Sequence, residues 1–381
     1  MKIVLVGDVY PGGDLEETDA SRAVAVPAYC KADYRIATLE AAMSDADFRA
    51  NKCVLTCSSS AAQSLRHLSI NAVSLAENHI HDMGDRGLAD TLEGLDALGI
   101  GHAGAGRSLA EARRPVWITD KLCILAYCRE RALTLNNVAV AGPGKSGVVP
   151  LTLENVLEDL AGIPSGAKAI LVFHWGCEHL WLTPYDNIEL ARKLLQEEKV
   201  ALIAGSHPHR VQGYLEQCGK RAYFSLGNFL FPNFYLDRPC VQVPPPRCRD
   251  KIPTTRYYHR VGQLTYKKWL RVNRVSLMVQ LEIGSGRITH QFVMQKDASP
   301  KVVPAPRWVR VAYGLRLKVL ALLSAQCPRW AYERLFTLNH GVAYWSWRWR
   351  IRMTRVRHLG VRGIGRRICG RMGAMGRRDG H

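Results

Sequence analysis

The sequence predicts an α/β fold in which buried strands are layered with helices. Short apolar stretches rich in Val and Ile alternate along the chain with stretches of helical periodicity, as in layered α/β proteins. Five of the apolar stretches are also followed by a polar side chain of a type that binds metals. The 381 residues are enough to bury a large core, as one big domain or two smaller ones.

Three strands are predicted in the first hundred residues, over 3–6, 34–40 and 71–76. The first is continuously apolar, which is typical of a strand buried on both faces, and it leads into Gly7-Asp8 and a turn-rich loop. Helices are predicted over 58–68, where serines can cap the start, and over 87–98. The second helix carries leucines on one face and ends at Gly99.

Beyond residue 100, strand segments are predicted over 100–106, 116–127, 169–173, 200–204 and 223–231, and helices over 153–160 and 186–198. The many prolines of residues 232–260 indicate a long loop or lid. Strands over 275–283 and 288–295 form a hairpin around Gly284-Ser-Gly286. We therefore expect one domain over 1–298, followed by a tail over 299–381.

Polar side chains follow the five apolar strands where each one ends. They are Asp8, Glu40, Asn78, His174 and the pair His207/His209. In layered α/β proteins, sites form in the crevice beyond the carboxyl ends of the strands. Each residue alone has an ordinary alternative as a turn former, a helix cap, a solvated strand end or a packed histidine. Their repetition at successive strand ends favours a metal or catalytic site.

The pair His207/His209 is separated by Pro208. Proline biases the residue before it toward an extended conformation, and in an extended chain alternate side chains point to the same side. We therefore expect both imidazoles to project together. A mixture of carboxylate, amide oxygen and imidazole suits one or two divalent ions of Mn, Fe or Zn in a hydrolytic centre.

Seven motifs follow one another in order across about residues 1–295. They are Gly7-Asp8, Thr38-Leu-Glu40, Ser74-Leu-Ala-Glu-Asn-His79 with Asp82-Met-Gly84, Gly104-Ala-Gly106, His174-Trp-Gly-Cys-Glu178, Gly205-Ser-His-Pro-His209 and Ser225-Leu-Gly-Asn-Phe229. Together they resemble the CapA family of bacterial capsule (poly-γ-glutamate) biosynthesis proteins, which are related to calcineurin-like metallophosphoesterases. The resemblance implies a four-layer αββα sandwich of the metallophosphoesterase type with a dinuclear centre.

The resemblance also implies a role for each metal-ligating residue. Asp8 and His209 would bind the first ion, and Glu40 would bridge the two ions. The second ion would be held by Asn78, His174 and His207.

Further residues would serve the substrate. His79 would act as general acid or transition-state stabiliser, with Asp82 orienting its ring. Glu178 and Asn228 would lie on the substrate side or support the site.

Several positions depart from the family's pattern. Tyr10 stands where the related phosphatases have a histidine, which CapA-type sequences generally lack, and Glu40 stands where the phosphatases have an aspartate. Thr38 and Glu77 replace asparagines that are usual in CapA proteins, and Ser206 replaces a histidine. We therefore predict that the first metal site, around Asp8, has few ligands.

The net charge of +19 is concentrated at the C-terminal end. Residues 301–381 hold 18 of the 52 Lys and Arg residues and two of the 33 acids, which leaves 34 cations against 31 acids in residues 1–300. Five of the nine tryptophans also lie in this tail, and residues 311–325 are predicted to form an amphipathic helix.

Three interpretations of the tail stay open. Tryptophan interleaved with arginine favours peripheral association with an anionic membrane surface. A helical tail that packs on the body, with a disordered end over 360–381, is the second. Binding to a polyanion such as polyglutamate is the third, and nucleic acid is the least favoured partner within it. The oligomeric state is not predictable from these features.

The eleven cysteines include no C-x-x-C pair, and the opening strand is too short for a signal peptide. We expect a cytoplasmic protein, peripheral at the inner face of the membrane if the tail binds there. The leading functional hypothesis is a metal-dependent hydrolase acting on capsule or envelope polymer or its phosphorylated precursor. The alternatives are a non-catalytic accessory or scaffold subunit with a vestigial metal site, and a nucleic-acid phosphoesterase recruited by the tail.

Overall fold

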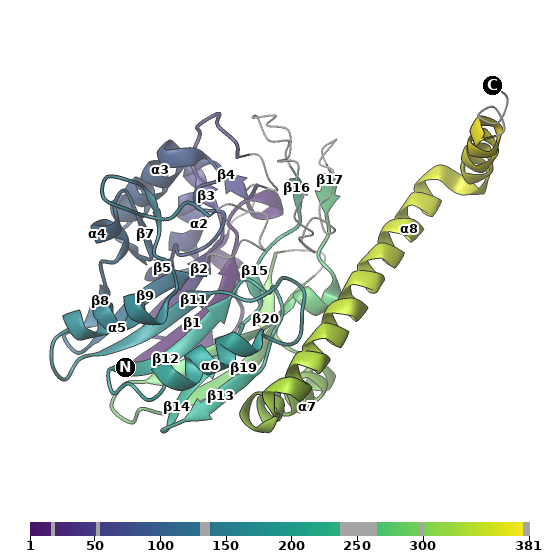
Figure 1. The fold of residues 1–381 in the computed structure, drawn as a ribbon. Coiled ribbons are helices and arrows are strands. Elements are labelled where there is room, and N and C mark those ends of the chain that lie inside the picture. The colour runs from purple at the N-terminus through teal and green to yellow at the C-terminus, as the bar shows by residue number, and fades with distance from the viewer. Residues whose placement is uncertain (17–19, 51–53, 130–137, 237–264, 297–299, 376–381) are drawn as a thin grey trace. The chain divides into compact units, whose positions relative to one another are not determined.

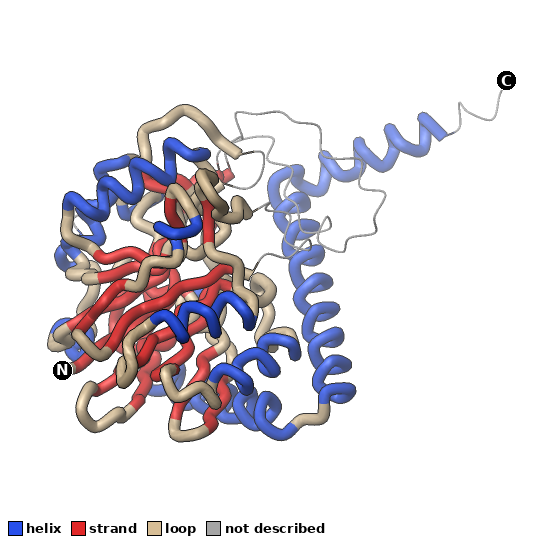
Figure 2. The backbone as a smooth tube through the Cα atoms, turned by 60° about the vertical axis from the view of Figure 1, so that its left-hand side comes forward, coloured by secondary structure: helices blue, strands red, loops and turns tan. Residues whose placement is uncertain are grey.

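The computed structural model describes residues 1–16, 20–50, 54–129, 138–236, 265–296 and 300–375. The chain divides into two compact units, Met1–Glu333 and Arg334–His381. Most of the proline-rich loop or lid predicted over 232–260 lies outside the described residues. Figures 1 and 2 show that the strands form the interior of the first unit, with helices around them.

The larger sheet has eight strands in the order β20-β19-β18-β1-β2-β5-β6, with β15 beside the end of β1. β1, β2, β5, β6 and β15 are parallel to one another, whereas β18, β19 and β20 are each antiparallel to the strands beside them. The bounds are β1 Lys2–Val9, β2 Tyr34–Leu39, β5 Ala72–Ser74, β6 Gly101–Ala103, β15 Asn228–Leu230, β18 Val275–Glu282, β19 Ile288–Gln295 and β20 Val302–Pro304.

The second sheet has six strands in the order β13-β14-β12-β11-β9-β8. Its four central strands are parallel, and both edge strands are antiparallel to their neighbours. The bounds are β8 Val116–Thr119, β9 Leu122–Cys128, β11 Lys168–His174, β12 Val200–Ser206, β13 Tyr214–Gln217 and β14 Lys220–Tyr223. The strands β9, β11 and β12 consist mostly of buried residues, as the apolar runs predict.

Shorter elements complete the described chain. Two-stranded pairs are β3 Ala42–Met43 with β4 Thr56–Cys57, β7 Ala105–Gly106 with β10 Gly147–Val148, and β16 Phe234–Leu236 with β17 Thr265–Lys267. The α-helices are α1 Pro27–Cys30, α2 Ala62–His67, α3 Gly84–Ala97, α4 Leu109–Ala112, α5 Leu153–Gly162, α6 Tyr185–Leu194, α7 Arg307–Gln326 and α8 Arg329–Met375. The described 3-10 turns are Gly13–Leu15, Ala20–Arg22, Ser59–Ala61 and Arg271–Asn273.

Both sheets contribute to one hydrophobic core. Leu5 and Ile36 of the larger sheet and Ile170 and Leu202 of the second belong to the same cluster of buried side chains. Removing this apolar surface from water is the main stabilising contribution to the first unit. The predicted α/β class is confirmed, and the four-layer arrangement stays a prediction.

One predicted strand is wrong in extent. Residues 223–231 were expected to form a single interrupted strand, but β14 ends at Tyr223 in the second sheet and β15 begins at Asn228 in the larger sheet. The segment between them carries the chain from one sheet to the other. Gly227, with a φ of 74°, makes the turn that this crossing requires.

The C-terminal segment is helical in two parts. α7 belongs to the first unit, where Tyr313 and Leu317 are buried. α8 begins in the first unit and continues into the second, and its side chains are described as far as Met353, except for Ile351. None of the helices has, within the described residues, a segment long and apolar enough to cross a membrane. The boundary at residue 298 and the disordered end over 360–381 stay predictions.

Candidate metal centre

The predicted ligands converge at the carboxyl ends of strands from both sheets. Asp8 lies at the end of β1 and Glu40 directly follows β2, both in the larger sheet. His174 ends β11, and His207 and His209 follow β12 in the second sheet. All five side chains are buried, with at most 4% of each residue exposed. The fold therefore brings together residues that are 201 positions apart in the sequence.

Two glycines permit the close approach of backbone that this convergence needs. A side chain at Gly7 would place its Cβ 1.8 Å from the carbonyl oxygen of Gly227, and one at Gly205 would place it 2.1 Å from that of Phe224. Neither approach leaves room for a methyl group. The glycines thus set the spacing of the strand ends that carry Asp8 and His207.

The first ligand group consists of Asp8, Glu40 and His209, each offering an atom within 4.8 Å of the others. The Nδ1 atom of His209 lies 3.5 Å from Asp8 Oδ2, and its Nε2 atom lies 3.5 Å from Glu40 Oε1. The same Nδ1 atom lies 2.9 Å from Asn228 Oδ1, so Asn228 orients the ring. Asn228 is 1% exposed, a position that supports His209 and does not face solvent.

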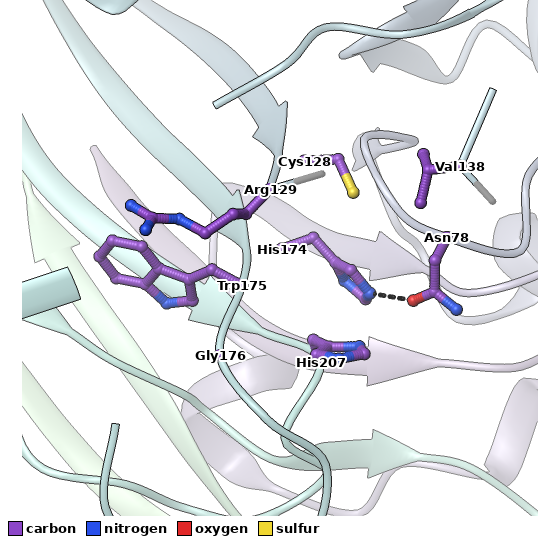
Figure 3. Close-up of a pocket in the computed structure, with 8 residues that line it drawn as sticks. All are labelled: Asn78, Cys128, Arg129, Val138, His174, Trp175, Gly176 and His207. Atoms are coloured by element: carbon purple, nitrogen blue, oxygen red, sulfur yellow. Dashed lines mark hydrogen bonds between the residues drawn. The ribbon is translucent and has the colours of Figure 1, made fainter. Parts of the chain in front are cut away.

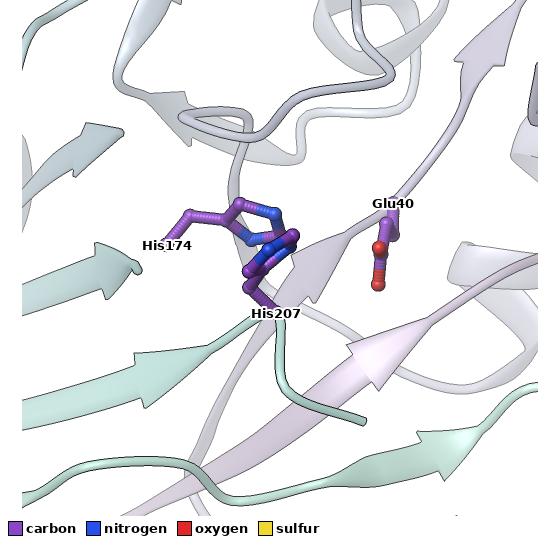
Figure 4. A group of neighbouring side chains, drawn as sticks. All are labelled: Glu40, His174 and His207. Carbon is purple, nitrogen blue, oxygen red and sulfur yellow. The ribbon is translucent and has the colours of Figure 1, made fainter. Parts of the chain in front are cut away.

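The second ligand group consists of Glu40, His174 and His207, again within 4.8 Å (Figure 4). The Nε2 atom of His174 lies 2.6 Å from Asn78 Oδ1 (Figure 3). On its other side, His174 Nδ1 lies 2.9 Å from Ser206 Oγ. Both ring nitrogens of His174 are therefore held. Because Glu40 belongs to both groups, its carboxylate lies where a bridge between two ions would be needed.

The expectation of an extended His207 is wrong. Its φ is 92°, and that of His209 is 54°, so both residues lie in the left-handed region that residues other than glycine rarely adopt. Strained conformations of this kind cluster at functional sites. The two rings still face the centre, with centroids 6.4 Å apart, and each belongs to a different ligand group.

The residues present fit a cation. Both carboxylate oxygens of Asp8 and the Nδ1 atom of His207 are buried and make no well-formed hydrogen bond to the residues that the structure describes. Burial of an ionised carboxylate is costly unless a charge compensates for it. The donor set of carboxylate, imidazole and amide oxygen suits a divalent ion such as Mn, Fe or Zn.

Burial also controls the protonation of these groups. It raises the pKa of the Asp8 carboxyl, and the nearby His209 acts in the opposite direction. Burial lowers the pKa of His207 to about 4. At neutral pH this imidazole is therefore neutral, which is the form that binds metals.

His79 and Asp82 form a buried pair beside these groups. The Nδ1 atom of His79 lies 2.7 Å from Asp82 Oδ2, which also accepts a hydrogen bond of 2.8 Å from the backbone N–H of Leu55. The carboxylate of Glu77 accepts the backbone N–H of His79. Asp82 thereby fixes the orientation of the His79 ring.

Glu178 is less enclosed than the other predicted site residues, with 45% of its side chain exposed. Its charge raises the pKa of His207 against the effect of burial, which places it within electrostatic reach of the second ligand group. It lies in the loop that follows β11, and its partially exposed position is compatible with the predicted substrate side.

Some neighbours of the centre were not predicted. A small pocket against His174 and His207 is also lined by Cys128, which ends β9, and by Arg129, which follows it (Figure 3). The rings of Trp269 and Phe231 lie 5.0 and 5.5 Å from that of His209. Trp269 follows the proline-rich segment, and nothing in its local sequence connects it with the histidines.

A family model described as "Bacterial capsule synthesis protein PGA_cap" matches residues 2–233. PGA biosynthesis protein CapA of Bacillus subtilis (strain 168) is 25% identical over 177 residues, which cover 44% of this chain and 44% of that protein. Capsule biosynthesis protein CapA of Bacillus anthracis is 24% identical over 178 residues, or 44% of this chain and 42% of that protein. The chain thus spans less than half the length of these two relatives.

A probable polyglutamine synthesis accessory protein of Mycobacterium tuberculosis (strain CDC 1551 / Oshkosh) is 26% identical over 260 residues, which cover 61% of this chain and 66% of that protein. A crystal structure of a Thermus thermophilus protein aligns over 62% of this chain and 92% of that one, with 13% identity and a TM-score of 0.34. The family model covers more than half of the chain, so this protein belongs to the bacterial capsule synthesis protein family.

Proposed function

We propose that the protein is a metal-dependent hydrolase that cleaves a phosphoester or another polarised bond during the synthesis of a capsule or envelope polymer. The observation that carries the proposal is the position of Glu40, whose carboxylate belongs to both ligand groups. A carboxylate shared by two ligand groups can bridge two neighbouring ions, as in two-metal hydrolytic sites. The four-layer sandwich and the dinuclear centre implied by the CapA resemblance are part of this proposal.

The ligands divide between the two positions as the geometry suggests. Asp8 and His209 would hold the first ion, while Asn78, His174 and His207 would hold the second. A divalent ion held by these residues would supply Lewis-acid polarisation of a phosphoryl oxygen and a water of lowered pKa. Ser206 and Asn228 keep the rings of His174 and His209 in the orientation that ligation needs.

His79 supplies the proton for the leaving group. Its Nδ1–H donates to Asp82 Oδ2 at 2.7 Å, and the buried carboxylate stabilises the ring when it carries a positive charge. Nε2 then holds the proton that passes to the leaving oxygen. Glu178, at the more exposed side, contacts the substrate.

The substrate is capsule or envelope polymer or a phosphorylated precursor of it. This part of the proposal is supported by the names of the Bacillus relatives, which concern capsule and PGA biosynthesis. It extends what is known of those proteins to a chain that spans only part of their length.

The test measures metal content and hydrolysis on the same purified protein. Mass spectrometry of the metals should find Mn, Fe or Zn, and a nitrophenyl phosphodiester should be hydrolysed. Exchange of His79→Asn should lower kcat by about 10²- to 10⁴-fold, as for the loss of a general acid, with metal content unchanged. Absence of both bound metal and hydrolysis would refute the enzyme hypothesis.

The second candidate is a non-catalytic accessory subunit of polymer synthesis with a vestigial site. The name of the Mycobacterium tuberculosis relative, an accessory protein, favours it. In that case, the contribution to polymer synthesis does not depend on hydrolysis at the metal centre. Complementation of a strain that lacks the gene separates the candidates, because an accessory subunit should restore polymer with His79→Asn and an enzyme should not.

A further inference from the structure

α7 has two apolar faces, and only one of them packs against the body of the protein. The inner face buries Val309, Tyr313, Leu317 and Leu320. On the opposite side, five apolar residues recur at spacings of three and four and lie exposed on the described surface: Trp308, Val311, Leu315, Val319 and Leu322. We call these five residues the α7 stripe. With about two thirds of Val311 and Leu315 exposed, it needs a partner.

α7 is held firmly, so the stripe is a fixed surface. The guanidinium of Arg316 lies 4.0 Å from the ring centroid of Trp181, which also contacts Tyr313. Arg192 donates hydrogen bonds of 2.8 and 3.0 Å to the carbonyl oxygens of Ser324 and Ala325. A cation at this position satisfies the free carbonyls of a helix C-terminus and opposes the negative end of its dipole.

Positive charge flanks the stripe. Arg307, Arg310 and Lys318 of α7 are exposed, and residues 307–326 contain no acid. Arg271, from a neighbouring turn, places its guanidinium 4.7 Å from the ring centroid of Trp308. Arg307 and Trp308 also line a shallow hollow with Val311 and Ala312. An apolar surface edged by cations complements an anionic partner with an apolar interior.

We propose that the α7 stripe binds the surface of a bilayer rich in anionic phospholipids. The helix would lie in the plane of the interface, with Leu315 and Leu322 among the acyl chains and Trp308 at headgroup level. A second copy of α7 is disfavoured because its cations would face like charges. Nucleic acid would meet the cations and Trp308 but leave the aliphatic residues unused. The proposal is independent of the hydrolase activity.

Co-sedimentation tests it with the full chain and vesicles of phosphatidylserine and phosphatidylcholine in equal parts. Exchange of Leu315→Ser and Leu322→Ser together should weaken partitioning about tenfold or more, because two apolar side chains no longer enter the interface. The control is Ala321→Ser with Ala325→Ser, which places two serines on the same helix outside the stripe and the hollow and should bind as the parent chain does.

Further experiments test the contributions of charge and of self-association. Exchange of Lys318→Gln should weaken binding about fivefold, and pure phosphatidylcholine vesicles should bind poorly. Equal binding by the leucine variant and its control would overturn the proposal. So would a loss of dimer mass by sedimentation velocity in the leucine variant with vesicle binding intact, because the stripe would then serve a second copy. Circular dichroism verifies that each variant is folded.

Discussion

The two ligand groups that share Glu40 are built differently. In the second ligand group, both ring nitrogens of His174 have polar partners, Asn78 and Ser206. The first ligand group contains Asp8, whose buried oxygens have no well-formed hydrogen bond in the described chain. The contact with Ser206 thus orients His174 of the second ligand group before any ion binds, whereas the buried carboxylate of Asp8 in the first ligand group would gain its compensation from the ion. Their affinities for metal should differ accordingly.

Exchange of the shared residue should have the largest effect. Glu40→Ala removes a ligand from both groups at once, so metal content should fall to near zero at both positions. Activity should fall by at least about a thousandfold, because the loss exceeds that of a residue that only supports a ligand. Metal analysis after dialysis measures the first quantity, and a phosphodiester assay measures the second. Retention of one full equivalent of metal would show that Glu40 is not shared.

The two histidines of the Ser-His-Pro-His segment allow the groups to be separated. His207→Ala should weaken metal binding at the second ligand group about a hundredfold. His209→Ala should weaken binding only at the first ligand group. Calorimetric titration of each variant with Mn distinguishes the two metal positions. We expect the parent chain to show one tight and one weaker event, with the tight event lost in His207→Ala. Loss of the tight event in His209→Ala would show that the first ligand group, and not the second, binds metal more tightly.

The sequence predicts most of this centre because its signal is local. Each of Asp8, Glu40 and His174 ends or follows an apolar strand, and parallel strands must end at a common edge. The same reasoning predicts the α/β class. It fails for His207, where the tendency of a residue before proline to be extended is overridden by the tertiary structure, which holds a φ of 92°.

Contacts between distant segments were beyond prediction. Trp269 lies beside His209 although 60 residues separate them, and no periodicity connects the two. Residues 223–231 appear as one apolar run, but their neighbours belong to two sheets, which only the three-dimensional pairing determines. The role of each site residue, unlike its position, stays a prediction.

Supporting residues should show smaller effects of the same kind. Ser206→Ala removes the partner of His174 Nδ1 at 2.9 Å and should weaken the tight metal position about tenfold. Asn228→Ala removes the corresponding partner of His209 and should act on the weaker position alone. The same Mn titrations measure both. Ser276, a buried serine outside the ligand groups, supplies a matched control as Ser276→Ala, which should leave both events unchanged.

The smallest expected effect concerns stability without metal. Burial raises the pKa of the Asp8 carboxyl, so the folded chain disfavours its charge, and Asp8→Asn removes that charge at nearly constant volume. In the metal-free protein, the exchange should raise the free energy of unfolding by about 1–2 kcal/mol at neutral pH. With Mn present the order should reverse, because the parent chain gains binding energy that the variant lacks. Urea unfolding with and without chelator measures both differences. A variant that is less stable than the parent chain in chelator would show that Asp8 stabilises the fold. The buried charge of Asp8 would then be compensated without an ion in the first ligand group.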